Sequence, residues 1–141
     1  ESVLDVACGT GYSTAVLSLL ANDVIGLERR TDLVQKAERN LIDLNVDNAF
    51  VVKGSLRKGH ESQAPYDVIF VEGGVDFVPK DLLIQLNTGG RLLTISNSNF
   101  KNFGQAILYL KTKTSVSKRL LFEANTSLLP SFEKKNTFKF F

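Results

Sequence analysis

The residues best suited to chemistry lie in one short segment near the start of the chain, Val3 to Tyr12. An apolar stretch ends there in Gly9-Thr10-Gly11, and residues 13–20 follow with apolar side chains at helical spacing. Because glycine lacks a Cβ atom, Gly9 and Gly11 allow the backbone to turn tightly and to approach a ligand. Amide groups at the start of the following helix would point at that ligand. The segment therefore predicts a cofactor site at the carboxyl end of a strand.

Two acidic residues narrow the choice of cofactor. Glu28 ends a second apolar stretch about twenty residues further on, where dinucleotide-binding proteins place the acid that binds a ribose. The third glycine of the dinucleotide motif is missing, because Ser13 and Thr14 occupy that region. Asp5 also places a carboxylate near the turn, which suits an ammonium or sulfonium group better than a pyrophosphate. These residues favour a cationic ligand with a ribose over a nicotinamide dinucleotide, although an oxidoreductase remains an alternative.

The single cysteine and the single histidine do not indicate a reactive pair or a metal site. Cys8 fits the turn as a small residue, and His60 lies in a distant polar stretch. With one Cys and one His, no zinc site of the usual composition can be assembled, and we expect no metal. One cysteine also excludes an internal disulfide, which favours a reducing, cytoplasmic location.

Strand and helix patterns alternate over most of the chain. A helix predicted from Thr31 to Leu44 has a polar face and an apolar stripe. The stripe consists of Leu33, Val34, Ala37, Leu41 and Leu44. Further elements are strands at 3–6, 24–27, 49–52, 68–71 and 91–95, a loop at 53–65, and a helix opened by Pro79 with Leu82, Leu83 and Leu86 inward. Such alternation is typical of a largely parallel sheet covered by helices.

The alternation stops after Ser96. Residues 97–104 are too few for a crossover helix, so we expect the next strand, 106–110, to run antiparallel to its neighbour and 117–122 to pair back. The fold class is therefore α/β, with a parallel five-stranded sheet and an antiparallel two-strand edge, in a single domain over residues 1–141. The tail, 128–141, carries four Phe residues and is expected to cover the core as an irregular flap.

Composition and charge exclude several kinds of partner. The formal net charge is +2, which is too small to indicate nucleic acid. We interpret the densest basic stretch, Lys111 to Arg119, as a solvated hairpin surface. No apolar run reaches the ~18 residues that a membrane helix needs. We expect neither a nucleic acid nor a membrane partner, and the sequence leaves the oligomeric state open.

The first motif resembles that of class I S-adenosylmethionine methyltransferases, in which an acid precedes a small residue and Gly-x-Gly, as Asp5 through Gly11 do here. Other stretches are similar, in the same order, to the protein-L-isoaspartate O-methyltransferase family. They are Ala37-Glu38-Arg39-Asn40-Leu41, Asp47-Asn48, Ala64-Pro65-Tyr66-Asp67-Val68-Ile69, Val78-Pro79 and Leu86-Asn87-Thr88-Gly89-Gly90-Arg91-Leu92. The resemblance covers essentially the whole chain and implies a Rossmann-like methyltransferase fold.

This resemblance implies S-adenosylmethionine as the cofactor and a protein or peptide carboxylate as the methyl acceptor, as in protein repair. It implies that Gly9 and Gly11 hold the methionine part, that Asp5 supports its amino end, and that Glu28 accepts from the ribose hydroxyls. The full set of candidate cofactor-binding residues is Asp5, Ala7, Gly9, Gly11, Tyr12, Glu28, Arg29, Ser55, Leu56 and Glu72.

Two positions depart from the family pattern. Many relatives carry Gly-Asp after the third strand, whereas Gly54 is followed here by Ser55 and Leu56. Ser55 could accept one hydrogen bond from the adenine and Leu56 could pack on its ring. Glu72 stands where relatives usually carry Thr, and it either faces the methionine ammonium or is solvated. A cofactor-binding domain with a different acceptor, or with none, therefore remains an alternative.

No catalytic residue can be assigned from these residues. An ionised carboxylate needs no strong base to accept a methyl group, so the protein contributes mainly by positioning and by excluding water. In the resembled family, a hydroxyl-bearing segment upstream of the first motif largely builds the acceptor site. Residue 1 is Glu rather than Met. We expect a truncated chain that binds the cofactor and shows little isoaspartyl methylation alone.

Overall fold

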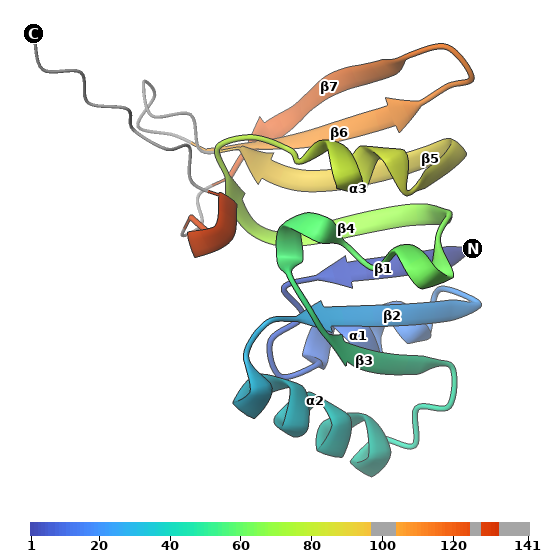
Figure 1. The fold of residues 1–141 in the computed structure, drawn as a ribbon, viewed down its shortest axis with the longest axis vertical. Helices are drawn as coiled ribbons and strands as arrows, with labels where there is room; N and C mark the ends of the chain where they lie inside the picture. The colour runs from blue at the N-terminus through green and yellow to red at the C-terminus, as the bar shows by residue number, and fades with distance from the viewer. Residues whose placement is uncertain (97–103, 125–127, 133–141) are drawn as a thin grey trace, which may run out of the picture.

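The computed structural model describes residues 1–96, 104–124 and 128–132. Its centre is a seven-stranded sheet in the order β3-β2-β1-β4-β5-β6-β7 (Figure 1). The strands are β1 (Ser2–Val6), β2 (Asp23–Glu28), β3 (Ala49–Lys53), β4 (Tyr66–Val75), β5 (Leu86–Ser96), β6 (Gln105–Lys111) and β7 (Val116–Glu123). The first five are parallel, and β6 and β7 are antiparallel to their neighbours. The predicted fold class and its antiparallel edge are confirmed.

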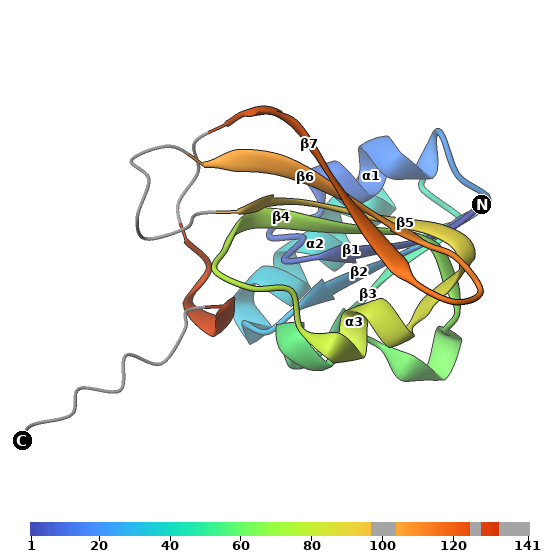
Figure 2. The same cartoon turned by 90° about the horizontal axis from the view of Figure 1, so that it is seen from above.

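Helices lie on both faces of this sheet, and Figure 2 shows α1 and α3 on opposite sides. Helices α1 (Tyr12–Ser18) and α2 (Thr31–Asp43) pack on one face around a small core that includes Ala15, Ala37 and Val51. Helix α3 (Lys80–Ile84) and the single 3-10 turns η1 (Leu56–Lys58), η2 (Glu61–Gln63) and η3 (Pro130–Phe132) complete the set of helical elements in the described residues. The larger core lies under α3, η1 and η3. Because β1 and β2 are covered on both faces, most of their residues are buried.

Three helix predictions need correction at their ends. Helix α1 stops at Ser18 instead of Leu20, and Leu19 and Leu20 are exposed. Asn48 explains this end, because its Nδ2 donates to the carbonyl oxygens of Ser18, Ala21 and Asn22 at 2.8 to 3.2 Å. The chain therefore leaves the helix where a side chain satisfies its free carbonyl groups.

The other two corrections concern leucines predicted to face inward from helices. Leu44 lies just beyond the end of α2 and is 59% exposed, so the buried stripe ends at Leu41. Leu86 is buried, but it begins β5 and does not belong to α3. Strand β5 is therefore longer than predicted, because Leu86 pairs with Tyr66 before the register shifts toward Arg91.

One lysine of the basic hairpin is not solvated as expected. Lys111 Nζ donates to the carbonyl oxygens of Leu83, Ile84 and Leu86 at 2.9 to 3.2 Å. A lysine at the carboxyl end of a helix satisfies free carbonyls and interacts favourably with the helix dipole. Lys111 thus ties the antiparallel edge to α3.

A bulge in β4 shapes the carboxyl edge of the sheet. Phe70 pairs with Leu93 and Gly74 pairs with Ile95. Over this interval β4 advances by four residues while β5 advances by two. The bulge contains Glu72 and Gly73. Gly73 has φ 155°, and a Cβ there would lie 2.5 Å from Leu129 Cγ. The bulge therefore needs glycine, and a residue of the tail covers it.

The described part of the tail agrees with the expected cover over the core. Phe132 is fully buried, Leu128 bridges to Gly74, and Leu129 N donates to Gly74 O at 2.9 Å. The other three tail phenylalanines and the connection 97–103 lie outside the described residues. None of the described helices is both long and apolar enough to cross a membrane.

Candidate cofactor site

The turn between β1 and α1 has an unusual backbone. Ala7, Gly9 and Gly11 have φ values of 65°, 58° and 85°, in the left-handed region that favours glycine. A Cβ at Gly9 would meet no atom within 4 Å, whereas one at Gly11 would lie 3.0 Å from Ala37 Cβ. Gly11 is therefore needed where the turn approaches α2. Gly9 faces open space and leaves its backbone accessible to a ligand.

Glu28 holds this turn from the end of β2. Its Oε2 accepts a hydrogen bond from Gly9 N at 3.0 Å, and its Oε1 accepts from Arg29 N at 2.9 Å and from Arg30 N at 3.3 Å. Only 5% of the Glu28 residue is exposed. The predicted ribose acid is thus joined to the predicted glycine turn, and its two oxygens have lone pairs beyond those used in these three hydrogen bonds.

Asp5 lies beneath the first turn of α1 and is completely buried. Its Oδ2 accepts from Ser13 Oγ at 2.7 Å and from Thr14 Oγ1 at 2.8 Å. Its Oδ1 is buried and accepts from no hydroxyl or amide group of the described residues. Asp5 therefore has an acceptor oxygen that no hydroxyl or amide of the described residues uses, beside the Glu72 carboxyl group.

Glu72 joins this group from the bulge of β4, because its Oε2 is hydrogen bonded to Ser13 Oγ. Burial and the neighbouring Asp5 carboxylate together raise the pKa of Glu72 to about 8. Burial also raises the pKa of Asp5, against the hydrogen bonds from its neighbours. Two carboxyl groups thus compete for a proton at the carboxyl ends of β1 and β4.

The other predicted site residues surround this centre at different depths. Tyr12, at the start of α1, is 77% exposed, and Arg29 is also exposed. Ser55 is exposed after β3, while Leu56 beside it is 3% exposed and belongs to the larger core. The carboxyl edge therefore brings together Asp5, the glycine turn, Glu28 and Glu72, with Ser55 on the β3 side.

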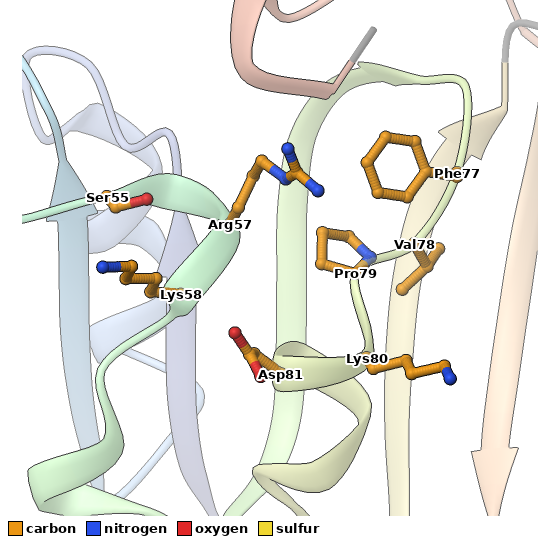
Figure 3. Close-up of a pocket in the computed structure, with 8 residues that line it drawn as sticks. All are labelled: Ser55, Arg57, Lys58, Phe77, Val78, Pro79, Lys80 and Asp81. Carbon is orange, nitrogen blue, oxygen red and sulfur yellow. The ribbon is translucent and has the colours of Figure 1, made fainter. Parts of the chain in front are cut away.

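A pocket of about 660 Å³ opens beside Ser55, between η1 and the start of α3 (Figure 3). The Arg57 guanidinium lies 4.9 Å from the centre of the Phe77 ring. Figure 3 shows Asp81 directed into the space between these two segments, whereas Lys80 points away. Of the predicted site residues, only Ser55 lines this pocket.

A second, smaller cavity lies on the β5 side of Glu72. It measures about 260 Å³ and is lined mainly by apolar side chains of β4 to β7, among them Phe70, Leu93, Ile95 and Phe122. Glu72 and Gly73 also line it. Glu72 therefore stands between the glycine turn and an apolar cavity.

Cys8 and His60 carry no sign of reactivity. Burial raises the pKa of the Cys8 thiol to about 12, which keeps it protonated and unreactive. His60, which precedes η2, has its Nε2 2.9 Å from Ser62 Oγ. Among the residues that the structure describes, no group of three His, Cys, Asp or Glu side chains could hold a metal ion.

A sequence model of the family described as protein-L-isoaspartate(D-aspartate) O-methyltransferase matches residues 1–123. The chain belongs to this family. Protein-L-isoaspartate O-methyltransferase of Pyrococcus abyssi is 43% identical over 93 residues, which cover 65% of the chain and 43% of that protein. Its counterpart in Methanococcus maripaludis is 36% identical over 126 residues, which cover 87% of the chain and 58% of that protein. The chain thus spans about half the length of these relatives.

Solved structures agree with the family assignment. A protein-L-isoaspartate O-methyltransferase superposes with a TM-score of 0.84 at 31% identity, over 91% of the chain and 41% of that structure. A Plasmodium falciparum protein, described as a putative member in complex with S-adenosyl-L-homocysteine, has a TM-score of 0.78. It is 23% identical, over 92% of the chain and 66% of that structure, and so supports the fold alone.

Sequence reasoning missed the contribution of two hydroxyl groups. Ser13 and Thr14 served only as evidence of a missing glycine, yet both donate to Asp5. The available signal was their position in the first turn of a helix that follows a strand acid. Two adjacent hydroxyl residues there can reach back to that acid.

Proposed function

We propose that this chain is the S-adenosylmethionine-binding domain of a protein-L-isoaspartate O-methyltransferase, whose acceptor is a carboxylate of a protein or peptide. The observation that carries the proposal is the hydrogen bond from Gly9 N to Glu28 Oε2. It joins the accessible glycine turn to a buried acid at the edge where α/β proteins bind nucleotide ligands. Family membership supports the same function.

The residues at this edge fit such a cofactor from end to end. Asp5 Oδ1 is an available acceptor for the ammonium of the methionine part, and Gly9 leaves room for close backbone contact. Glu28 has lone pairs for the ribose hydroxyls. We assign Ser55 and the exposed residue Arg29 to contacts with the adenine end of the cofactor. The proposed set also includes Ala7, Gly11, Tyr12, Leu56 and Glu72.

Bound S-adenosylmethionine would supply an electrophilic methyl group on a sulfonium. The chain's own residues would orient it and keep water away, because a carboxylate acceptor already carries the lone pair it needs. The apolar cavity that Glu72 helps to line is a candidate for the acceptor side of the site. A nicotinamide dinucleotide suits the site less well, because Asp5 and Glu72 would repel a pyrophosphate.

We further propose that residues 1–141 act as one domain in the cytoplasm. Support comes from the continuous sheet that runs through the chain and from the buried, unpaired Cys8 thiol.

Isothermal titration calorimetry with S-adenosylhomocysteine and with NAD, under the same conditions, tests the proposal. We expect saturable binding of S-adenosylhomocysteine with a stoichiometry of one and no binding of NAD. Binding of NAD in preference to S-adenosylhomocysteine would refute the proposed cofactor.

A further inference from the structure

Within the described part of the chain, Asp5 and Glu72 meet without a positively charged partner. Among the described residues, neither forms a salt bridge with a lysine or an arginine. Asp5 is fully buried and Glu72 is partly buried. Two neighbouring carboxylates that lose water without gaining a cation are strongly disfavoured, so their charge must be compensated in another way.

The hydrogen bonds indicate that a proton provides this compensation. Ser13 Oγ carries one hydrogen, yet it is hydrogen bonded to both Asp5 Oδ2 and Glu72 Oε2. A hydroxyl can donate only once, so one of the two contacts needs a proton from a carboxyl group. Asp5 already accepts from Thr14 as well, which favours the charged form of Asp5. The consistent arrangement is a protonated Glu72 that donates within this cluster, to Ser13 or directly to Asp5, while Asp5 stays charged.

No other nearby group among the described residues can replace this proton. Cys8 in the turn is neutral, because its pKa is about 12. Glu28 on β2 is an acid whose oxygens accept from backbone amides. From the tail, Leu129 covers Gly73 with an apolar side chain. On the β5 side, the cavity beside Glu72 is lined by apolar residues and Thr94.

We propose that the ammonium group of the cofactor's amino-acid part replaces the shared proton of Asp5 and Glu72, so that Glu72 determines selectivity for a cationic ligand and binding releases a proton. The free Oδ1 of Asp5 is the second sign of a ligand, because it is a buried acceptor with no hydroxyl or amide donor among the described residues. The released proton passes to the buffer, and the ligand's positive charge takes its place. This inference rests on the proposed cofactor function.

The bulge of β4 gives Glu72 this role. Two extra residues between Phe70 and Gly74 carry the Glu72 side chain toward α1 and Ser13, and Gly73 provides the backbone conformation that this requires.

Calorimetry of S-adenosylhomocysteine binding in phosphate and in Tris at pH 7 measures the released protons directly, because the two buffers differ in ionisation enthalpy. We expect close to one proton released per ligand. From pH 6 to 7.5, where the ligand amino group stays charged, the affinity should rise about tenfold per pH unit, and it should level off above pH 8. Binding with no proton release would overturn the inference while leaving the proposed cofactor intact.

Two variants complete the test. Glu72→Gln keeps the size of the side chain and removes its exchangeable proton, so binding should lose its proton release and most of its pH dependence. At pH 8.5 its affinity should be about tenfold below that of the wild type, and at pH 6, where the wild type must first lose the proton, the variant should bind more tightly than the wild type. Glu61→Gln, in the exposed η2 segment, removes an acid outside the site and should bind as the wild type does. Unchanged proton release in Glu72→Gln would also refute the inference, whereas absence of binding by the wild type at every pH would refute the cofactor proposal instead.

Discussion

Gly9 N donates to Glu28 Oε2 at 3.0 Å, so the residue that ends β2 holds the turn that follows β1. These residues lie 19 positions apart in sequence and meet because β1 and β2 are parallel neighbours in register, with Val6 beside Leu27. The same carboxylate would meet the ribose, so one buried acid orders the turn and contributes to the proposed site. This dual role leads to the first prediction.

Glu28→Gln should weaken both the fold and ligand binding. An amide oxygen can accept in place of one carboxylate oxygen, but the amide nitrogen would face a backbone N–H that also donates. We expect a loss of about 1 to 3 kcal/mol in unfolding free energy and at least about tenfold weaker binding of S-adenosylhomocysteine. Urea unfolding and calorimetry measure the two effects. Glu38→Gln, on the exposed side of α2, is the control, and equal behaviour of the two variants would contradict the assigned role of Glu28.

Gly11→Ala tests the close approach between the turn and α2. Its φ of 85° costs a side chain about 1 to 2 kcal/mol, and the new Cβ would also press on Ala37. Gly89→Ala is a matched control, because Gly89 has a φ of 83° and its added Cβ would meet no atom within 4 Å. We expect Gly11→Ala to unfold at lower urea concentration than Gly89→Ala and to lose ligand affinity. Equal stability and equal affinity in the two variants would show that the contact with Ala37 is unimportant.

Gly73→Ala tests whether the tail supports the bulge that positions Glu72. The added Cβ would lie 2.5 Å from Leu129 Cγ, so the bulge or the tail must move. We expect lower stability and weaker binding of S-adenosylhomocysteine. In a double-mutant cycle with Leu129→Ala, removal of the leucine should cost less in the Gly73→Ala background than in the wild type, with a coupling of about 0.5 to 3 kcal/mol. Strict additivity would contradict the contact.

The stability of the ligand-free protein should fall as the pH rises from about 5 to 8. The ordinary pKa of 4.5 for Glu72 is raised to about 8 in the fold, so over this interval the folded state binds a proton that the unfolded state has lost. The stabilisation that this proton provides is fully present below pH 4.5, the ordinary pKa, and is lost as the pH rises through about 8, the pKa in the fold. Glu72→Gln should therefore unfold at a higher temperature than the wild type at pH 8.5, by about 1 kcal/mol of stability after allowance for solvent screening.

Thermal unfolding at pH 5 and pH 8.5 measures this difference, which should shrink toward pH 5. Glu61→Gln again controls for the loss of an acid outside the site. A constant difference between Glu72→Gln and the wild type at both pH values would show that Glu72 does not change its proton affinity on folding.

The sequence by itself determined the order of elements and the type of site. Apolar periodicity indicated five parallel strands, and the eight-residue connection after Ser96 predicted the antiparallel edge. These features are local, because a strand or helix pattern depends on neighbouring residues and a short connection limits how strands can pair. The motif from Asp5 to Gly11, together with Glu28, located the proposed site for the same reason.

Only the tertiary structure decided how the acids are used. Sequence reasoning left Glu72 equally open to a ligand or to solvent, because nothing local showed the bulge of β4 or the contact with Ser13. The exposed end of α1 and the place of Leu86 at the start of β5 were likewise missed, since Asn48 and Tyr66 act on them from distant parts of the chain. Burial and the sharing of protons depend on which residues meet in space, and that is a property of the folded sheet.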